Sequence, residues 1–252
     1  MTTEPTSAFV WIWLPDEAEP VVCGRLEGDG DRASFAYVRS YLDRSDAVSI
    51  YEPELPLRRG RQHAAAGEGL PLCIADAMPD AWGRRLVNHR LGAPTAEFGE
   101  LTYLLESGSD RFGALDAQAD AERYEPRGEE RPALDVLAMA AERIEAGEAL
   151  GADLGAALLR GTSIGGARPK ALIDDGQRRF IAKFSSTSDP YPVVQGEFVA
   201  MELARRVGLD VARVQLTRAA GRYALLVERF DRAADRRRRA VSALTILRLD
   251  AF

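Results

Sequence analysis

The chain has 252 residues, of which 46% are hydrophobic and 29% are charged, a balance typical of a soluble globular protein. The formal net charge of −6 excludes a chain that is basic overall, so a nucleic-acid contact would need a local patch. The length allows one or two domains with a sizeable core.

The residue types give little support for a metal or redox site. Cys23 and Cys73 are flanked by apolar residues or glycine, which predicts two buried thiols in a reducing compartment. His63 and His89 lack ligand-like spacing, so no zinc site is expected. The apolar run at 8–14 is too short to span a bilayer and has no basic segment before it. A cytoplasmic protein without membrane contact is therefore expected.

Residues 8–120 are expected to form one α/β unit that begins with strands. Two paired strands are predicted at 9–14 and 20–28, with a polar turn between them. Residues 33–42 are ambiguous between strand and helix. A further short strand and a proline-bounded turn are predicted within 47–60.

Helices are predicted to follow these strands. The first begins after Pro79 and ends at Gly92, and a second, at 95–107, has its leucines at helical spacing. The stretch 118–132 is polar and punctuated by prolines, which is typical of a linker. A helix is predicted to follow it at 133–148.

The second half of the chain alternates strands with one helix. A hairpin is predicted at 170–184 with Asp175-Gly176 in its turn. An amphipathic helix at 192–209 and a second strand pair at 211–231 come next. On that helix the apolar face consists of Val199, Leu203, Ala204 and Val207, and Gly208 is its stop.

The stretch Ser163 to Lys170 combines the adjacent glycines Gly165 and Gly166 with a following lysine. Adjacent glycines allow several backbone N–H groups to converge on one point, and Lys170 adds a positive charge. Two interpretations stay open from the residues alone. One is a phosphate-holding loop, and the other is a tight turn between two strands.

Lys183 lies between apolar neighbours in a predicted strand. Strand alternation places it on one face with Ile181, and a buried ammonium group needs an anionic partner. Glu197 on the following helix is the expected partner, with Glu202 as its rival. The alternative is a Lys183 side chain that points into water. For Glu228 the alternative to a binding role is a solvated strand end.

The order of these parts is that of a protein-kinase N-lobe. There a loop covers the nucleotide phosphates, a strand lysine pairs with them, and a helix glutamate holds the lysine. A last strand leads into the hinge beside adenine. The matching parts are the loop at 163–170, Lys183, Glu197 and the segment 225–231.

Several stretches resemble the HipA family of bacterial serine/threonine kinases, the toxins of type II toxin–antitoxin systems. They are "GRLEG", "FAYVRSYL", "ELPLRRG", "LLESGSDRFGALD", "SIGGARPKALI", "IAKF", "GEFVAMELARRVGLDVA" and "ALLVERFDR". The resemblance implies an α+β fold with a HipA-like N-terminal α/β subdomain at 8–120. A linker and connecting helix at 121–160 would lead to a kinase N-lobe of antiparallel sheet plus helix at 161–252, with the Gly-rich loop and hinge.

The resemblance also implies roles for single residues. Ser163 is the expected autophosphorylation site, and Glu197 pairs with the nucleotide-binding lysine. The cofactors implied for an intact member are ATP and Mg²⁺. The ATP-binding residues expected are Gly165, Gly166, Lys170, Lys183, Glu228 and Phe230. The loop departs from the toxin form at Arg168-Pro169, where that form carries Gln-Glu, so the substrate stays open.

The family carries its acceptor-orienting Asp and its Mg²⁺ ligands in a helical C-lobe beyond the hinge. The chain continues only about twenty residues past "VERFDR", so we expect this lobe to be absent. Neither "NHRLGA" nor "SDRFGAL" is a credible substitute for the catalytic loop. We therefore expect no measurable kinase turnover from this chain alone.

The leading interpretation is a HipA-like serine/threonine kinase of a toxin–antitoxin system, inactive in this form. Intact members would act on a protein substrate such as an aminoacyl-tRNA synthetase and bind an antitoxin. The alternative is a non-catalytic interaction module that binds a kinase or an antitoxin. A third interpretation is DNA association, indirect through the antitoxin, involving the run Arg236 to Arg239. The plainer interpretation of that run is a solvated loop.

The last residues form an apolar tail. Such a tail indicates an interface with a partner or a tendency to aggregate. Residues after Asp231 are expected to fray, so trypsin should cut first within 233–240. The apolar tail consists of Leu244, Ile246, Leu247, Leu249 and Phe252.

Overall fold

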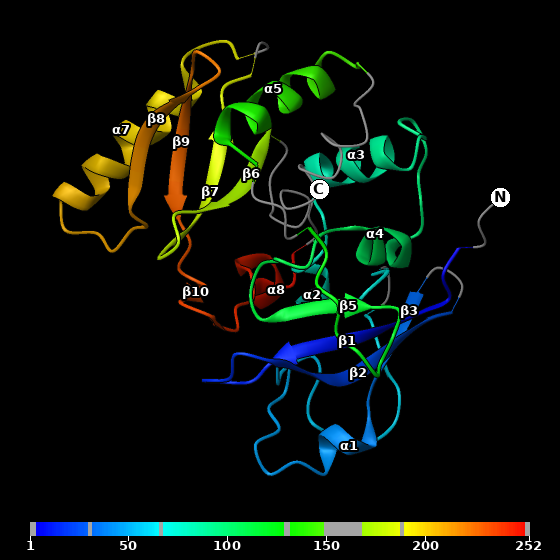
Figure 1. Cartoon of the computed structure of the whole chain (residues 1–252). Helices are drawn as coiled ribbons and strands as arrows, with labels where there is room; N and C mark the ends of the chain where they lie inside the picture. Colours follow the sequence, from blue (N-terminus) through cyan, green and yellow to red (C-terminus); the bar gives the residue numbers. More distant parts are fainter. Residues whose placement is uncertain are drawn as a thin grey trace.

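The structure is a computed structural model that shows a mixed α/β fold with antiparallel sheets (Figure 1). An α+β fold with antiparallel sheets was expected from the sequence, and at this level the prediction is confirmed. The described residues are 4–29, 32–65, 68–128, 132–148, 168–186 and 189–249.

The first sheet has five strands in the order β4-β3-β2-β1-β5, and all neighbouring pairs are antiparallel. β1 lies between β2 and β5, so both of its edges are hydrogen-bonded, and Val10 to Trp13 are all buried. β5 was not predicted as a strand. The strand bounds are β1 Ser7–Trp13, β2 Pro20–Asp29, β3 Arg32–Tyr37, β4 Gln62–His63 and β5 Leu115–Gln118.

The ambiguous stretch at 33–42 divides into the end of β3 and the short helix α1 (Arg39–Leu42). The strand predicted within 47–60 is wrong, because these residues form turns and bends. Prolines in this segment cannot donate to a strand ladder. A tyrosine hydroxyl forms hydrogen bonds with the backbone of this segment instead. Tyr37 Oη accepts from Ile50 N at 2.9 Å and donates to Leu55 O at 2.7 Å.

Three further helices follow in the first half of the chain, α2 (Leu72–Ala75), α3 (Ala81–Arg90) and α4 (Glu100–Glu106). The predicted helix after Pro79 is confirmed as α3. Asp80 caps its N-terminus by accepting a hydrogen bond from Gly83 N at 2.8 Å. The second predicted helix is present as α4 but is shorter than 95–107.

The second sheet has the order β6-β7-β9-β8 and is also antiparallel. The predicted hairpin and second strand pair are both confirmed. Two helices accompany this sheet, and both end before a glycine with positive φ, Gly147 at 73° and Gly208 at 87°. The bounds are α5 Leu134–Glu145, β6 Lys170–Asp174, β7 Arg179–Phe184, α7 Val193–Arg206, β8 Val214–Ala219 and β9 Arg222–Glu228.

The core of the second sheet includes side chains from the first half of the chain. Trp82 and Leu86 of α3 pack into the cluster formed by α5 and the second sheet. The Trp82 indole N–H also donates to Lys170 O at 3.1 Å. The two halves therefore share a hydrophobic core, and the domain boundaries expected from the sequence stay a prediction.

The stretch expected to be a linker is partly packed against the first sheet. The Tyr124 ring lies 5.4 Å, centroid to centroid, from both Trp11 and Trp13. Its hydroxyl donates to Asp116 Oδ2 at 3.0 Å. The start of this stretch therefore belongs structurally to the first half.

The chain ends in a two-stranded hairpin and a short helix beside the first sheet. These are β10 (Arg232–Ala233), β11 (Arg236–Arg237) and α8 (Ala243–Leu247). Asp76 accepts hydrogen bonds from Ser242 N at 2.7 Å and Thr245 Oγ1 at 2.8 Å, which fastens α8 to the end of α2. The expectation that everything after Asp231 frays is therefore wrong.

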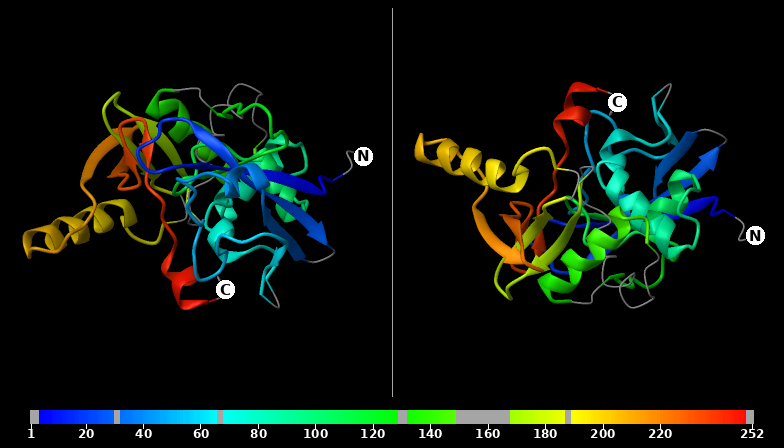
Figure 2. Two further views of the ribbon diagram at one scale, coloured as in Figure 1. Left: turned by 90° about the horizontal axis from the view of Figure 1, so that it is seen from below. Right: turned by 90° about the horizontal axis from the view of Figure 1, so that it is seen from above.

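The apolar face of α7 is exposed. Val199, Leu203 and Val207 are 53%, 56% and 75% exposed, and α7 projects from the body in both views of Figure 2. The predicted tail is exposed at Leu244, Ile246, Leu247 and Leu249, while Phe252 lies outside the described residues.

Both cysteines are buried and unpaired, as predicted. No helix in the described part of the chain has the length and apolar character needed to cross a membrane.

Candidate functional site

Lys183 lies on β7, on the face of the second sheet that α7 approaches. The burial of β7 alternates, with Phe180, Ala182 and Phe184 buried and Lys183 half-buried. Its ammonium group lies 2.5 Å from Glu197 Oε1 on α7. The ion pair expected between these two residues is present, while the role of Lys183 toward a nucleotide stays a prediction. Glu202, the rival partner, instead binds Arg205.

Lys170 lies directly across the ladder from Lys183, at the start of β6. These are the only two lysines in the sequence, where all other basic side chains except the two histidines are arginines. A chain rich in arginine therefore places both of its lysines on one pair of neighbouring strands. Lysine differs from arginine in carrying a compact point charge on a flexible stem.

The Lys170 side chain is 3% exposed, and its ammonium group lies 2.7 Å from Asp80 Oδ2. Burial lowers the pKa of Lys170, while Asp80 opposes that shift. Asp80 thus has two functions, because its other carboxylate oxygen caps α3. This contact links the start of β6 to the first half of the chain. The nucleotide contact expected for Lys170 stays a prediction.

The two residues expected at the hinge, Glu228 and Phe230, lie at the end of β9 and just beyond it. Glu228 N donates to Arg213 O at 2.8 Å, and Glu228 Oε2 is buried without a hydrogen bond, 3.8 Å from Arg178. Phe230 is 61% exposed and meets Phe112 at a steep ring angle. Ser163, Gly165 and Gly166 lie outside the described residues, so their predicted roles remain predictions.

A buried ionic cluster begins immediately after this strand end. We call Asp110, Arg229, Asp231 and Arg232 the Asp110–Asp231 cluster. Arg229 bridges the two carboxylates, at 3.0 Å from Asp110 Oδ1 and 2.7 Å from Asp231 Oδ2. Arg232 also bridges them, at 2.7 Å from Asp110 Oδ1 and 2.9 Å from Asp231 Oδ2.

The Asp110–Asp231 cluster joins two distant stretches, "SDRFGAL" and "VERFDR". Gly113 N donates to Asp231 Oδ2 at 2.8 Å, and Arg232 Nη1 donates to Gly113 O at 2.8 Å. From the sequence, the first stretch was not a credible catalytic loop, and no contact with the second stretch was predicted. Its aspartate and backbone hold the residues that flank the exposed Phe230. Spacing along the chain gave no sign of this pairing.

Acid should destabilise the protein through this cluster. Burial by itself would raise the pKa of Asp110 and Asp231, but Arg229 and Arg232 outweigh burial and hold both pKa values below the ordinary range. Such groups stabilise the fold above the unfolded-state pKa of roughly 3.9 and lose that contribution as pH falls. We expect the free energy of unfolding, measured by urea titration, to fall progressively below about pH 5. A constant value down to about pH 3 would contradict this.

The basic run at 236–239 is largely solvated, as favoured from the sequence, since Arg236, Arg238 and Arg239 are exposed, but several of its side chains also bind the first half of the chain. The Arg237 guanidinium lies 3.4 Å from the centre of the Trp13 ring and donates to Ser109 O at 2.9 Å. Arg236 pairs with Asp16 at 2.8 Å, and Arg239 donates to Ser49 O at 2.7 Å. These contacts fasten the hairpin to the first sheet, which also argues against preferred cleavage at Arg237.

Comparison with known protein families yields two adjacent matches. A model of the HipA N-terminal domain matches residues 13–118, and a model of the HipA-like C-terminal domain matches residues 162–252. A search among curated proteins gave no match.

A solved structure has a similar fold. It is the HipA chain of a complex of HipA, HipB and operator DNA from the toxin–antitoxin system of Shewanella oneidensis MR-1. The TM-score is 0.54 at 21% sequence identity, over 88% of this chain and 51% of that chain. The present chain thus spans about half the length of that HipA.

Proposed function

Because the chain belongs to the HipA family, we propose that its second sheet, with α7, is the nucleotide-binding lobe of a HipA-type serine/threonine kinase. The observation that carries the proposal is the Lys183–Glu197 ion pair between β7 and α7. In protein kinases a strand lysine, held by a helix glutamate, pairs with the nucleotide phosphates. Lys183 would supply this charge, and the segment 228–230 would lie beside adenine.

The described residues account for nucleotide binding better than for phosphoryl transfer. Transfer also needs a carboxylate that orients the acceptor hydroxyl and oxygen ligands for Mg²⁺. No group of three His, Cys, Asp or Glu side chains in the described ranges is arranged to hold a metal ion. We therefore assign no Mg²⁺ ligand and no catalytic step to the described residues.

Glu197 should contribute to ATP affinity by positioning Lys183. We expect Glu197→Gln to weaken ATP binding about fivefold, because an ion pair that is about one-third exposed on each side contributes at most about 1 kcal/mol. Isothermal titration calorimetry of the 252-residue chain measures this. Glu202→Gln, one and a half turns along the same helix, is the matched control and should bind as the unaltered chain does. Equal effects of the two substitutions would refute the assignment.

We further propose that the chain acts with an antitoxin and, through it, with DNA. The support is the similar fold of the Shewanella HipA, whose structure contains HipB and operator DNA. A protein substrate such as an aminoacyl-tRNA synthetase also stays a proposal.

A second candidate function, an interaction module, is favoured by the exposed face of α7. Three large apolar side chains one turn apart, Val199, Leu203 and Val207, are more than half exposed. A contiguous apolar patch of this kind marks an interface or a solubility liability. This function and nucleotide binding are compatible, because Glu197 lies nearer the start of the helix.

Charged substitutions on α7 should reduce self-association of the chain. We expect Leu203→Glu combined with Val207→Glu to shift the protein toward monomer in sedimentation velocity at high concentration, since both side chains face solvent. Arg205→Glu changes the charge of the same helix on its opposite side and serves as control. An unaltered chain that stays monomeric at all concentrations would contradict this expectation.

A further inference from the structure

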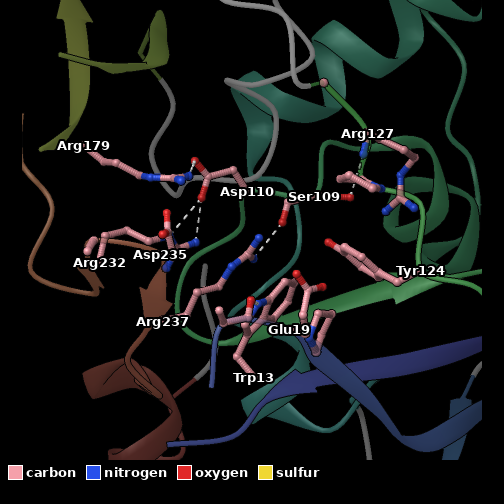
Figure 3. Close-up of a pocket in the computed structure, with 15 residues that line it drawn as sticks. Trp13, Glu19, Ser109, Asp110, Tyr124, Arg127, Arg179, Arg232, Asp235 and Arg237 are labelled. Carbon is pink, nitrogen blue, oxygen red and sulfur yellow. Dashed lines mark hydrogen bonds and ion pairs between the residues drawn. The ribbon is translucent and has the colours of Figure 1, made fainter. Parts of the chain in front are cut away.

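A cavity of about 480 Å³ lies between the first sheet and the β10–β11 hairpin (Figure 3). Its walls include Trp13 and Tyr124, together with the guanidinium groups of Arg127, Arg179 and Arg237. The volume falls in the range of small-molecule sites, roughly 300–1,000 Å³. Arg179 and Lys183 are four residues apart on β7, about 13 Å along a strand. The cavity is therefore distinct from the Lys183–Glu197 pair.

Arg237 is the cation of this cavity that lacks a carboxylate partner within the described part of the chain. It is half-buried, covers one face of Trp13, and donates a single hydrogen bond, to Ser109 O. An arginine side chain has five N–H donors. Burial lowers the pKa of Arg237, and the field of Asp110 only partly opposes that shift. Donors of this half-buried cation therefore stay available to a ligand.

The charge around the cavity is positive in excess. Among the buried and half-buried side chains, six arginines and three aspartates surround it or lie directly behind it, so these aspartates compensate only half of this positive charge. Burial and the neighbouring Arg229 lower the pKa of Arg232 to about 9, as expected where cations are crowded. The residues are Arg111, Arg127, Arg179, Arg229, Arg232, Arg237, Asp110, Asp116 and Asp231.

Two further carboxylates, Glu19 and Asp235, line the mouth of the cavity. Both residues are exposed, and among the described residues neither forms an ion pair with an arginine. Water screens such exposed charges far more than buried ones. They therefore offset the interior charge only weakly.

We propose that this cavity binds the phosphate group of a small phosphorylated ligand, with Arg237 as its main contact and Arg179 as a second. A guanidinium fork matches the oxygens of a phosphate and can donate two parallel hydrogen bonds to it. A dianionic group would also compensate the excess of buried positive charge. The inference is independent of nucleotide binding at Lys183.

Inorganic phosphate is the probe for this site. Isothermal titration calorimetry of the full chain, at matched ionic strength against chloride, should show saturable binding. Arg237→Gln should weaken it at least tenfold, because a charge-assisted contact is lost. Arg206→Gln removes an exposed arginine of α7 and should have no effect. Lys183→Ala should also leave phosphate binding unchanged, which separates this site from the proposed nucleotide site.

Because Arg237 stacks on Trp13, its substitution could disturb the local fold, so Arg179→Gln provides a second variant with a separate contact. It should weaken phosphate binding while thermal unfolding stays cooperative. Adenosine monophosphate and glucose 6-phosphate, as competitors, would show whether a nucleotide or a sugar carries the bound phosphate. Absence of saturable binding, or unchanged affinity in both arginine variants, would overturn the proposal. So would loss of phosphate binding in Lys183→Ala alone.

Discussion

Replacement of Asp231 by alanine is expected to lower the free energy of unfolding by about 3–5 kcal/mol, because it breaks a buried ionic cluster from one side. Asp231 is almost fully buried and accepts hydrogen bonds from Arg229, Arg232 and Gly113. Without it, two buried guanidinium groups would share Asp110 and leave donors unpaired. Removal of one partner costs more than the pair contributes when intact, since the remaining charges stay buried.

Urea denaturation followed by circular dichroism measures this loss. Asp235→Ala is the matched control, because Asp235 lies four residues further on in the exposed turn between β10 and β11. An exposed substitution of this kind should change stability by less than about 0.5 kcal/mol. A similar loss in both variants, or a loss below about 1 kcal/mol in Asp231→Ala, would show that the cluster does not hold the two halves together.

Lys183→Ala is expected to weaken ATP binding by about ten- to one-hundred-fold, since a hydrogen bond to a charged group contributes roughly 1.5–3 kcal/mol. The fold should survive, because the Lys183–Glu197 pair is about one-third exposed on each side and such pairs contribute little to stability. Calorimetric titration with ATP measures the affinity, and thermal unfolding verifies the fold. Unchanged ATP affinity in a folded Lys183→Ala variant would refute the nucleotide assignment.

The sequence predicted the elements of the second sheet well because its signals are local. Alternation along β7 placed Lys183 beside Ile181, and helical spacing placed Glu197 one element later within reach. Asp175-Gly176 forms the predicted turn between β6 and β7. Each of these inferences depends on residues fewer than twenty positions apart.

The parts that the sequence missed depend on contacts between distant residues. Asp110 meets Arg229 across 119 positions, and Arg237 meets the Ser109 carbonyl across 128. The run of arginines at 236–239 is mostly exposed, as its composition indicates, but its contacts with Trp13, Asp16 and Ser49 could not be predicted from composition. The strand predicted within 47–60 is absent for a related reason. Tyrosine hydroxyls from β3 and α1, rather than a neighbouring strand, form hydrogen bonds with the backbone of this stretch.

We propose that the nucleotide phosphates lie at Lys183, and the scarcity of lysine offers a direct test of this position. An acyl phosphate of ATP transfers its acyl group to a nearby lysine amine and releases ATP. The chain has only two lysines, Lys170 and Lys183, so mass spectrometry of the digested protein can assign the label. We predict acylation mainly at Lys183, suppressed by excess ATP, with less at Lys170 because that side chain is buried against Asp80. Labelling of neither lysine, or labelling that excess ATP does not reduce, would contradict the account.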